Sequence, residues 1–136
     1  ETGEIEVVNY AAVDDFGTVV NPMVVEGQVH GGIAQGLGQA MLENAVYDDE
    51  GQLISGSYMD YTMPRADDIP PISIETLPTQ TSTNPLGVKG AGEAGTVGAT
   101  PVVISAILDA LADSGVEDIA LPATPQRIWE ALNPGQ

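Results

Sequence analysis

The sequence predicts a single α+β domain over residues 1–136, with a mixed or antiparallel sheet and two main helices packed against it. Two segments, residues 5–13 and 72–77, alternate β-branched or aromatic residues with polar ones, as half-buried strands do. Two other segments, residues 23–44 and 101–112, are apolar over helical lengths. A chain of 136 residues is long enough for one domain with a modest core.

The first helix is predicted over residues 23–44. Its apolar residues recur every four positions: Val25, Val29, Ile33, Leu37 and Met41. The same segment contains five glycines, each of which costs about 1 kcal/mol relative to alanine inside a helix. That cost indicates that something large approaches the helix closely. Packing against the sheet and contact with a cofactor both remain open as explanations.

The middle of the chain alternates turn residues with short apolar pieces. Residues 45–54 predict a hairpin, because the letters DDEG at 48–51 form an Asp/Gly turn between two apolar pieces. Residues 63–71 contain three prolines and predict a loop. The second strand then follows at residues 72–77.

The second helix is predicted to begin after a glycine-rich loop. Residues 86–98 contain five glycines and predict that loop. Thr100 is then predicted to cap the N-terminus of a helix that is apolar on most faces, with Pro101 at its first position. Residues 119–121 predict a short strand. A second Thr-Pro pair at 124–125 opens a short final helix over residues 126–132, which carries the only tryptophan, Trp129.

Charge and composition exclude several classes of function. The formal net charge is −17 with three basic residues, so the chain repels nucleic-acid phosphates and anionic lipid. No cysteine is present, which removes disulfides, iron–sulfur ligands and thiolate nucleophiles. A single histidine excludes a multi-histidine metal site. No apolar run reaches the roughly 18 residues of a membrane span, and no signal peptide is visible.

The strongest local signal for chemistry is residues 87–95, which read GVKGAGEAG. One carboxylate, Glu93, stands among glycines just before a helix, where it can act as a general base near a closely approaching ligand. A turn-rich linker is the plain alternative. A phosphate-binding P-loop is excluded because no Lys-Ser/Thr follows the glycines, and a dinucleotide fingerprint lacks the strand it requires.

A second signal is residues 27–40, in which Gln28, Gln35 and Gln39 share one helical face among glycines. Amide side chains in this setting suit the polar edge of a cofactor. Surface glutamine is the ordinary explanation, and we prefer it for Gln39. His30 lies in the same stretch, and a structural or solvated role is the better interpretation for a lone histidine.

Three motifs together resemble the molybdenum-cofactor-binding large subunits of the xanthine dehydrogenase, aldehyde oxidoreductase and aerobic carbon monoxide dehydrogenase family. They are DDFGTVVNP at 14–22, GQVHGGIAQGLG at 27–38 and GVKGAGEAG at 87–95. The resemblance covers nearly the whole chain and is closest to bacterial carbon monoxide dehydrogenase large-chain-like proteins.

The resemblance implies roles for particular residues. Glu93 matches the family's active-site glutamate, the general base beside molybdenum. Gln28 matches a glutamine that contacts the cofactor, and Lys89, Gly90, Ala91 and Gly92 match the segment that lines it. No residue of this chain is expected to ligate the metal. The reaction implied is oxidation of an aldehyde, N-heterocycle or carbon monoxide with water as the oxygen source.

The resemblance also implies a larger assembly. The chain starts at Glu1 and enters a predicted strand at once, so we expect a C-terminal fragment of a longer subunit. The full subunit would bind molybdenum-molybdopterin in its cytosine dinucleotide form, beside iron–sulfur and FAD subunits, in a cytoplasmic heterotrimer that pairs as a homodimer. The isolated chain is expected to be inert and to hold no cofactor. The active-site loop that separates the family branches is absent.

Two other functions stay open from the residues alone. The first is a non-catalytic acidic domain, derived from this family and used for binding or subunit assembly. The second is a nucleotide-binding domain, which rests on the glycine pattern at 90–95 alone.

Overall fold

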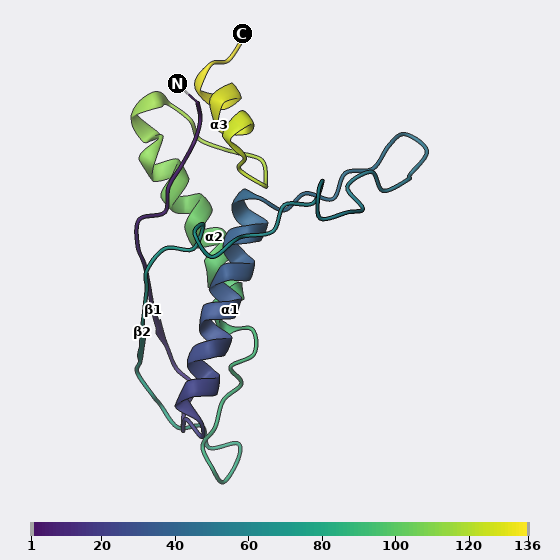
Figure 1. Cartoon of the computed structure of the whole chain (residues 1–136). Coiled ribbons are helices and arrows are strands. Elements are labelled where there is room, and N and C mark those ends of the chain that lie inside the picture. The colour runs from purple at the N-terminus through teal and green to yellow at the C-terminus, as the bar shows by residue number, and fades with distance from the viewer. Residues whose placement is uncertain (1, 136) are drawn as a thin grey trace.

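The computed structural model describes residues 2–135, in which two long helices pack against each other beside a two-stranded sheet (Figure 1). The element order is β1 (Tyr10–Asp14), α1 (Pro22–Met41), β2 (Ile72–Thr76), α2 (Ala94–Ala110), a 3₁₀ turn (Ala112–Ser114) and α3 (Pro125–Leu132). The hairpin region between α1 and β2 extends away from the helix pair as an arm, and α3 lies near both chain ends. The predicted α+β class is confirmed.

The sheet differs from the prediction in its direction. Strands β1 and β2 pair in parallel, from Tyr10 opposite Ile72 to Asp14 opposite Thr76, so the pairing is neither mixed nor antiparallel. The chain reaches β2 only after crossing back along α1, and a helical crossover is the connection that parallel strands require. Alternation of apolar and polar residues predicts which side chains face inward, but it carries no signal of strand direction.

Only part of the predicted first strand pairs. Residues 5–9 make no ladder with the rest of residues 2–135, and β1 begins at Tyr10. Ile5 and Val7 still turn toward the core, whereas Val8 is exposed. The alternation was therefore interpreted correctly, but no neighbouring strand accompanies this stretch.

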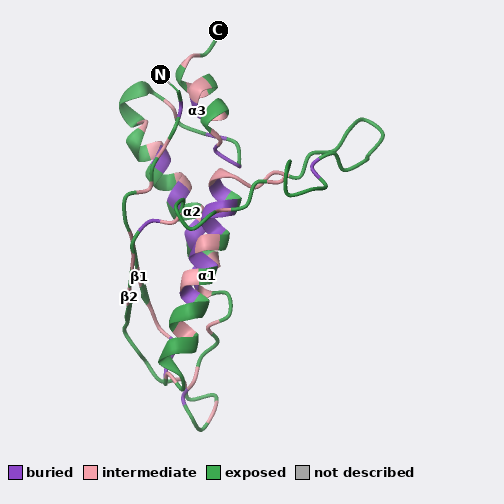
Figure 2. Cartoon of the chain, viewed as in Figure 1, coloured by how far each residue is buried: buried purple, intermediate pink, exposed green. Residues whose placement is uncertain are grey.

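Helix α1 agrees with the prediction and forms the centre of the core. Asn21 caps it by accepting a hydrogen bond from Val24 N at 3.2 Å, and Pro22 occupies the first position, which suits a residue without an N–H. Val29, Ile33 and Leu37 are buried against α2, and each such burial stabilises the fold by about 1.5–3 kcal/mol. Figure 2 shows the buried residues gathered where the two helices meet.

The predicted start of the second helix was wrong. Helix α2 begins at Ala94, so Thr100 is not an N-cap and Pro101 lies inside the helix. A proline there removes one backbone hydrogen bond and costs about 3 kcal/mol or more. The extra turns before it are held by contact with α1, because Gly95 and Ala99 are buried at the crossing and the Thr100 hydroxyl donates to Gly36 O at 3.4 Å.

The short elements were predicted unevenly. The final helix α3 is confirmed, and Thr124 caps it by accepting from Arg127 N. The hairpin is confirmed as a minimal one, with an antiparallel bridge between Tyr47 and Leu53. Residues 119–121 form no strand; this segment instead leads to Ala123, whose N–H donates to Ala40 O at 2.7 Å.

Candidate functional site

The glycine-rich segment at 87–93 is fixed against the turn that follows β1. Gly17 and Val88 form an antiparallel bridge, so the first and third sequence motifs lie side by side. Two backbone hydrogen bonds complete it: Thr18 N to Gly87 O at 3.0 Å and Lys89 N to Phe16 O at 2.9 Å. Gly17 has a φ of 59°, and a Cβ there would lie 2.1 Å from Gly87 O. Only glycine allows this approach.

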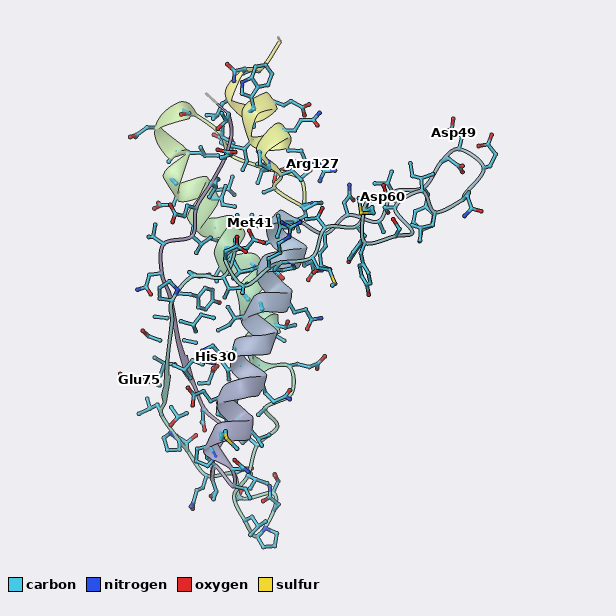
Figure 3. All side chains as sticks on the ribbon, in the orientation of Figure 1. His30, Met41, Asp49, Asp60, Glu75 and Arg127 are labelled. Carbon is cyan, nitrogen blue, oxygen red and sulfur yellow. The ribbon has the colours of Figure 1, made fainter. Side chains whose placement is uncertain are left out.

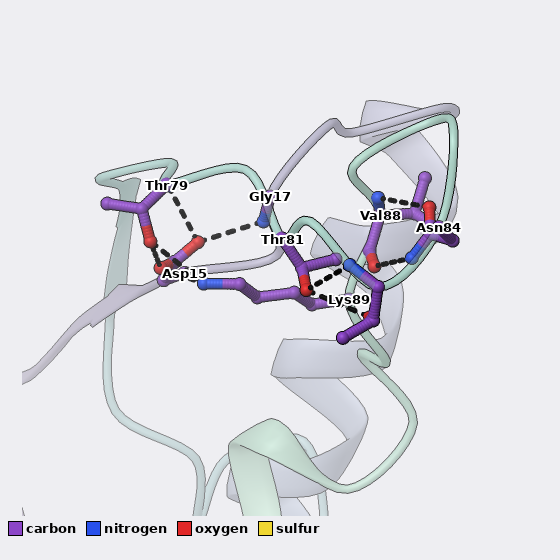
Figure 4. A network of polar contacts seen from close by, with 8 residues as sticks. Asp15, Gly17, Thr79, Thr81, Asn84, Val88 and Lys89 are labelled. Carbon is purple, nitrogen blue, oxygen red and sulfur yellow. Dashed lines mark hydrogen bonds and ion pairs between the residues drawn. The ribbon is translucent and has the colours of Figure 1, made fainter.

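A polar network around Asp15 joins three segments at this point (Figure 4). Asp15 Oδ1 accepts from Gly17 N and from Thr79 N, each at 2.9 Å. Asp15 Oδ2 accepts from Lys89 Nζ at 2.5 Å and from the Thr79 hydroxyl. The Lys89 ammonium, followed by the Thr79 donors, holds the pKa of the Asp15 carboxyl well below its usual range. The carboxylate is therefore charged at neutral pH.

Asn84 brackets the same segment from its other side. Its amide Nδ2 donates to Val88 O at 3.0 Å, and its Oδ1 accepts from Val88 N at 3.1 Å. Both backbone polar groups of Val88 are thereby satisfied by one side chain. Asp15, Thr79 and Asn84 were not among the site residues predicted from the sequence. The signal was present in the Asp-x-Gly and Asn-Pro-x-Gly turn patterns, but their partners lie far apart in the chain.

Four of the five α1 glycines form two pairs that differ in what lies beside them. A Cβ on Gly32 would lie 2.8 Å from Thr96 N, and one on Gly36 would lie 2.4 Å from Ala99 Cβ, so these two glycines serve helix–helix packing. A Cβ on Gly27 or Gly31 would meet nothing within 4 Å. Packing therefore explains the first pair, and the second pair exposes bare helix backbone.

The glutamines divide in the same way. Gln35 Oε1 lies 3.1 Å from the Thr96 hydroxyl and Gln39 Oε1 lies 3.1 Å from that of Thr100, so both belong to the contact between α1 and α2. Gln28 is exposed and makes no side-chain hydrogen bond within residues 2–135. His30 directs Nδ1 to Glu26 O in its own helix at 3.0 Å, which agrees with the structural interpretation.

Glu93 is the last residue before α2 and its side chain is exposed. It makes no capping hydrogen bond to its own helix, so the carboxylate points to no partner among the described residues. Gly90 and Gly92 before it are exposed, with nothing within 4 Å of a Cβ. Two residues after it, Gly95 packs so tightly on α1 that a Cβ would lie 2.4 Å from Val29 O. The first turn of α2 therefore packs on α1 at Val29 and Gly32, one and four residues after Gln28.

The surface beside this segment is apolar. It contains a hollow of about 210 Å³, none of whose lining residues is acidic: Phe16, Thr18, Val19, Val20, Asn21, Val24, Val25, Val88 and Lys89. Val20, Met23 and Val24 are more than half exposed around it. In a chain of net charge −17, such a patch is a local exception.

A larger hollow, of about 560 Å³, lies between α2 and residues 5–14. Its lining is mostly apolar, and Asp14 contributes a buried Oδ2 that has no hydrogen-bond partner among residues 2–135. Burial, with a smaller contribution from the nearby Asp14 charge, raises the pKa of Tyr10. Ala94 and Gly95, which follow Glu93, line this hollow together with the polar residues Glu6 and Asn9.

A partly buried hydrogen bond ties the projecting arm to the chain just after α1. The Tyr61 hydroxyl donates to Glu43 Oε2, and this bond raises the pKa of Tyr61. Asp49 lies at the tip of the arm, far from the helix pair, whereas Glu75 lies on the outer side of the sheet (Figure 3). The acidic charge at the tip of the arm is therefore remote from the segment that bears Glu93.

Within residues 2–135, no three His, Asp or Glu side chains gather closely enough to hold a metal ion. In the same range, every helix is too short or too polar to span a membrane.

The family description "molybdopterin cofactor-binding domain" matches residues 1–70. The chain is 38% identical over 131 residues to the carbon monoxide dehydrogenase large chain of Hydrogenophaga pseudoflava, covering 96% of this chain and 16% of that protein. It is 39% identical over 130 residues to the nicotine 6-hydroxylase large subunit of Paenarthrobacter nicotinovorans, with the same coverage.

A solved structure agrees with these matches. The crystal structure of quinoline 2-oxidoreductase from Pseudomonas putida 86 superposes with a TM-score of 0.92 and 44% identity, over 95% of this chain and 16% of that one. The chain therefore spans about a sixth of the length of the relatives it matches, and it keeps their fold over that part.

Proposed function

The chain belongs to the molybdopterin cofactor-binding domain family, and on this premise we propose that it is a C-terminal segment of the large subunit of a molybdenum-dependent hydroxylase. Its relatives of similar sequence are named for carbon monoxide, nicotine and quinoline. The substrate class proposed is accordingly an N-heterocycle, an aldehyde or carbon monoxide. The observation that carries the proposal is the close packing of Gly95, two residues after Glu93, on α1 at Gly32, one turn after Gln28.

The described residues fit a large cofactor that approaches backbone. Gly27 and Gly31 on α1, and Gly90 and Gly92 before α2, leave open space where a side chain would stand. At these positions a pterin can approach the backbone N–H and C=O groups closely. When bound, the molybdenum-molybdopterin group supplies the oxidation chemistry, with water as the source of oxygen.

We assign the residues the following parts. Glu93 is the general base, since its carboxylate is exposed, lacks a partner in its own helix and follows an open glycine segment. Gln28 offers an amide that both donates and accepts hydrogen bonds to the cofactor edge. Lys89, Gly90, Ala91 and Gly92 form the segment that passes along the cofactor.

The larger assembly belongs to the same proposal. The remainder of the large subunit would cover the apolar hollow beside Val20 and Val88 and would complete the cofactor site. Iron–sulfur and FAD subunits would remove the electrons, because this chain has no cysteine to hold a cluster. A cytosine dinucleotide form of the pterin, a cytoplasmic location, a paired heterotrimer and inactivity of the chain alone complete the proposal.

The test is made on the full-length protein purified from its source cell with a C-terminal tag. We expect about one molybdenum per large polypeptide, with flavin and iron–sulfur subunits co-purifying. Glu93→Gln should lower kcat by about 10²–10⁴-fold, the usual contribution of a general base, while molybdenum content stays unchanged. Glu75→Gln, the same change on the outer side of the sheet, is the matched control.

Two results would overturn the proposal. A free polypeptide of this length without molybdenum or partners would favour the non-catalytic binding domain. Full activity in a molybdenum-loaded Glu93→Gln enzyme would remove Glu93 from the chemistry.

A further inference from the structure

Glu93 is held between two anchors, one before it and one after it in the chain. Ahead of it, Lys89 is tied by its side chain to Asp15 at 2.5 Å and to the Thr79 hydroxyl at 2.8 Å. Behind it, α2 is tied to α1. Only the segment Gly90-Ala91-Gly92 separates Glu93 from the first anchor.

The second anchor is steric as well as polar. Gly95 lies directly against α1, where a Cβ would be 3.1 Å from Gly32 Cα. The Thr96 hydroxyl donates to Gly32 O at 2.7 Å. The first turn of α2 therefore has little freedom to shift along α1.

The connecting segment has little structure of its own. Gly90 and Gly92 have nothing packed near them, and Ala91 alone touches the core cluster. Extended chain reaches at most about 3.6 Å per residue, so residues 90–92 limit how far Glu93 can lie from Lys89. The position of Lys89 therefore constrains that of Glu93.

We propose that Asp15 is a positioning residue for Glu93, acting through its ion pair with Lys89. The inference rests on the proposed function, since it assigns Asp15 to the same site. Asp15 suits this part because its carboxylate accepts hydrogen bonds from three separate segments, through Gly17 N, Thr79 N and Lys89 Nζ. Lys89 Nζ donates both to Asp15 Oδ2 and to the Thr79 hydroxyl, which lie in the chain that follows β1 and β2.

The network contributes position more than stability. The Asp15 and Lys89 side chains are about a third exposed, and ion pairs in such settings stabilise proteins little. Its effect should therefore appear in turnover. A base misplaced by about 1 Å can cost about a hundredfold in rate.

The experiment compares Asp15→Asn, Lys89→Met and the double variant in the full-length holoenzyme. We expect each single variant to keep its molybdenum and to lose about 10- to 100-fold in kcat. The double variant should lose no more than the worse single one, because both changes break the same link. Lys89→Arg should recover most of the loss, since it restores a cation opposite Asp15.

Two further readouts separate positioning from a purely structural effect. The acid limb of the kcat profile against pH should move in Asp15→Asn, because the substitution removes a negative charge from the network beside the site. Amides of residues 90–95 should exchange with solvent at least about tenfold faster, a change of about 1.4 kcal/mol. Asp109→Asn, the same substitution on an exposed part of α2, is the matched control and should alter neither.

The outcomes distinguish this inference from the proposed function. An inactive Glu93→Gln enzyme beside a fully active Asp15→Asn enzyme would overturn the inference alone. Strictly additive losses in the double variant, or unchanged exchange at 90–95, would overturn it too. If the protein holds no molybdenum, the proposed function fails, while the exchange measurement still decides whether Asp15 fixes the segment.

Discussion

Two neighbouring glycines of α1 should respond oppositely to the same substitution. Gly31 and Gly32 stand side by side in the middle of the helix, so both changes to alanine remove the same backbone freedom from the unfolded chain. Gly31 faces open space, whereas Gly32 faces the first turn of α2. The pair thus separates helix propensity from packing.

The magnitudes follow from the contacts. At Gly31 the alanine methyl meets nothing within 4 Å, so the gain is the propensity difference of about 0.8–1 kcal/mol. At Gly32 the methyl would lie 2.8 Å from Thr96 N and 2.9 Å from Gly95 Cα, against an optimum of about 3.5–4.0 Å between carbons.

Those neighbours are backbone atoms and cannot rotate away. Relief requires the helices to separate, and overpacking of this kind costs about 1–3 kcal/mol. Because the clash is with backbone atoms, we place the cost near the upper end of this range. After the propensity gain is subtracted, we expect Gly32→Ala to destabilise the folded chain by about 1–2 kcal/mol. The two variants should then differ by about 2–3 kcal/mol.

Urea unfolding of the chain, followed by far-ultraviolet circular dichroism, measures both effects as opposite shifts of the midpoint at constant slope. Stabilisation of both variants would mean that α1 and α2 do not cross at Gly32. Destabilisation of both would mean that Gly31 is not open in the isolated chain.

Three further predictions concern single polar groups. Because the pKa of Asp15 is lowered in the folded state, its contribution to stability is present above the unfolded value of about 3.9 and is lost as pH falls through the folded value. Asp15→Asn should therefore destabilise the chain at neutral pH, and the deficit in urea midpoint should shrink below about pH 4. Glu43→Gln should return the raised pKa of Tyr61 toward about 10. A tyrosinate absorbance titration, with Tyr61→Phe as the reference, measures this change. An unchanged titration would contradict the hydrogen bond. Thr124→Ala should cost about 0.5–2 kcal/mol by removing the cap of α3, and the fluorescence of Trp129 should report earlier loosening of that helix than in Thr124→Ser.

Local chemistry was enough to predict several elements. Helices α1 and α3 were recognised from periodicity and from an Asn-Pro or Thr-Pro start, and both starts are capped in the structure as that chemistry requires. The hairpin at 45–54 followed from its Asp/Gly turn. The site residues were reached through the resemblance of three motifs, and the structure brings the segments of all three together.

The start of α2 was mispredicted for a definable reason. Thr100-Pro101 has the local signature of a helix start, and Thr124-Pro125 shows that the same signature can be decisive. At Thr100 the outcome depends on α1, whose glycines admit Gly95 and Ala99 at close range. Nothing within the few residues around Pro101 encodes that contact.

The residues of the proposed site can be read from the sequence: a carboxylate among glycines, no cysteine, and three motifs typical of one family. Which glycines pack and which stay open depends on how the chain folds, as does the approach of Lys89 to Asp15 and Thr79. Glycines look alike in a sequence, because a residue without a side chain records no neighbour. Asp15, Thr79 and Lys89 are brought together only when β1 and β2 pair in parallel and direct the chain after each strand to the same edge.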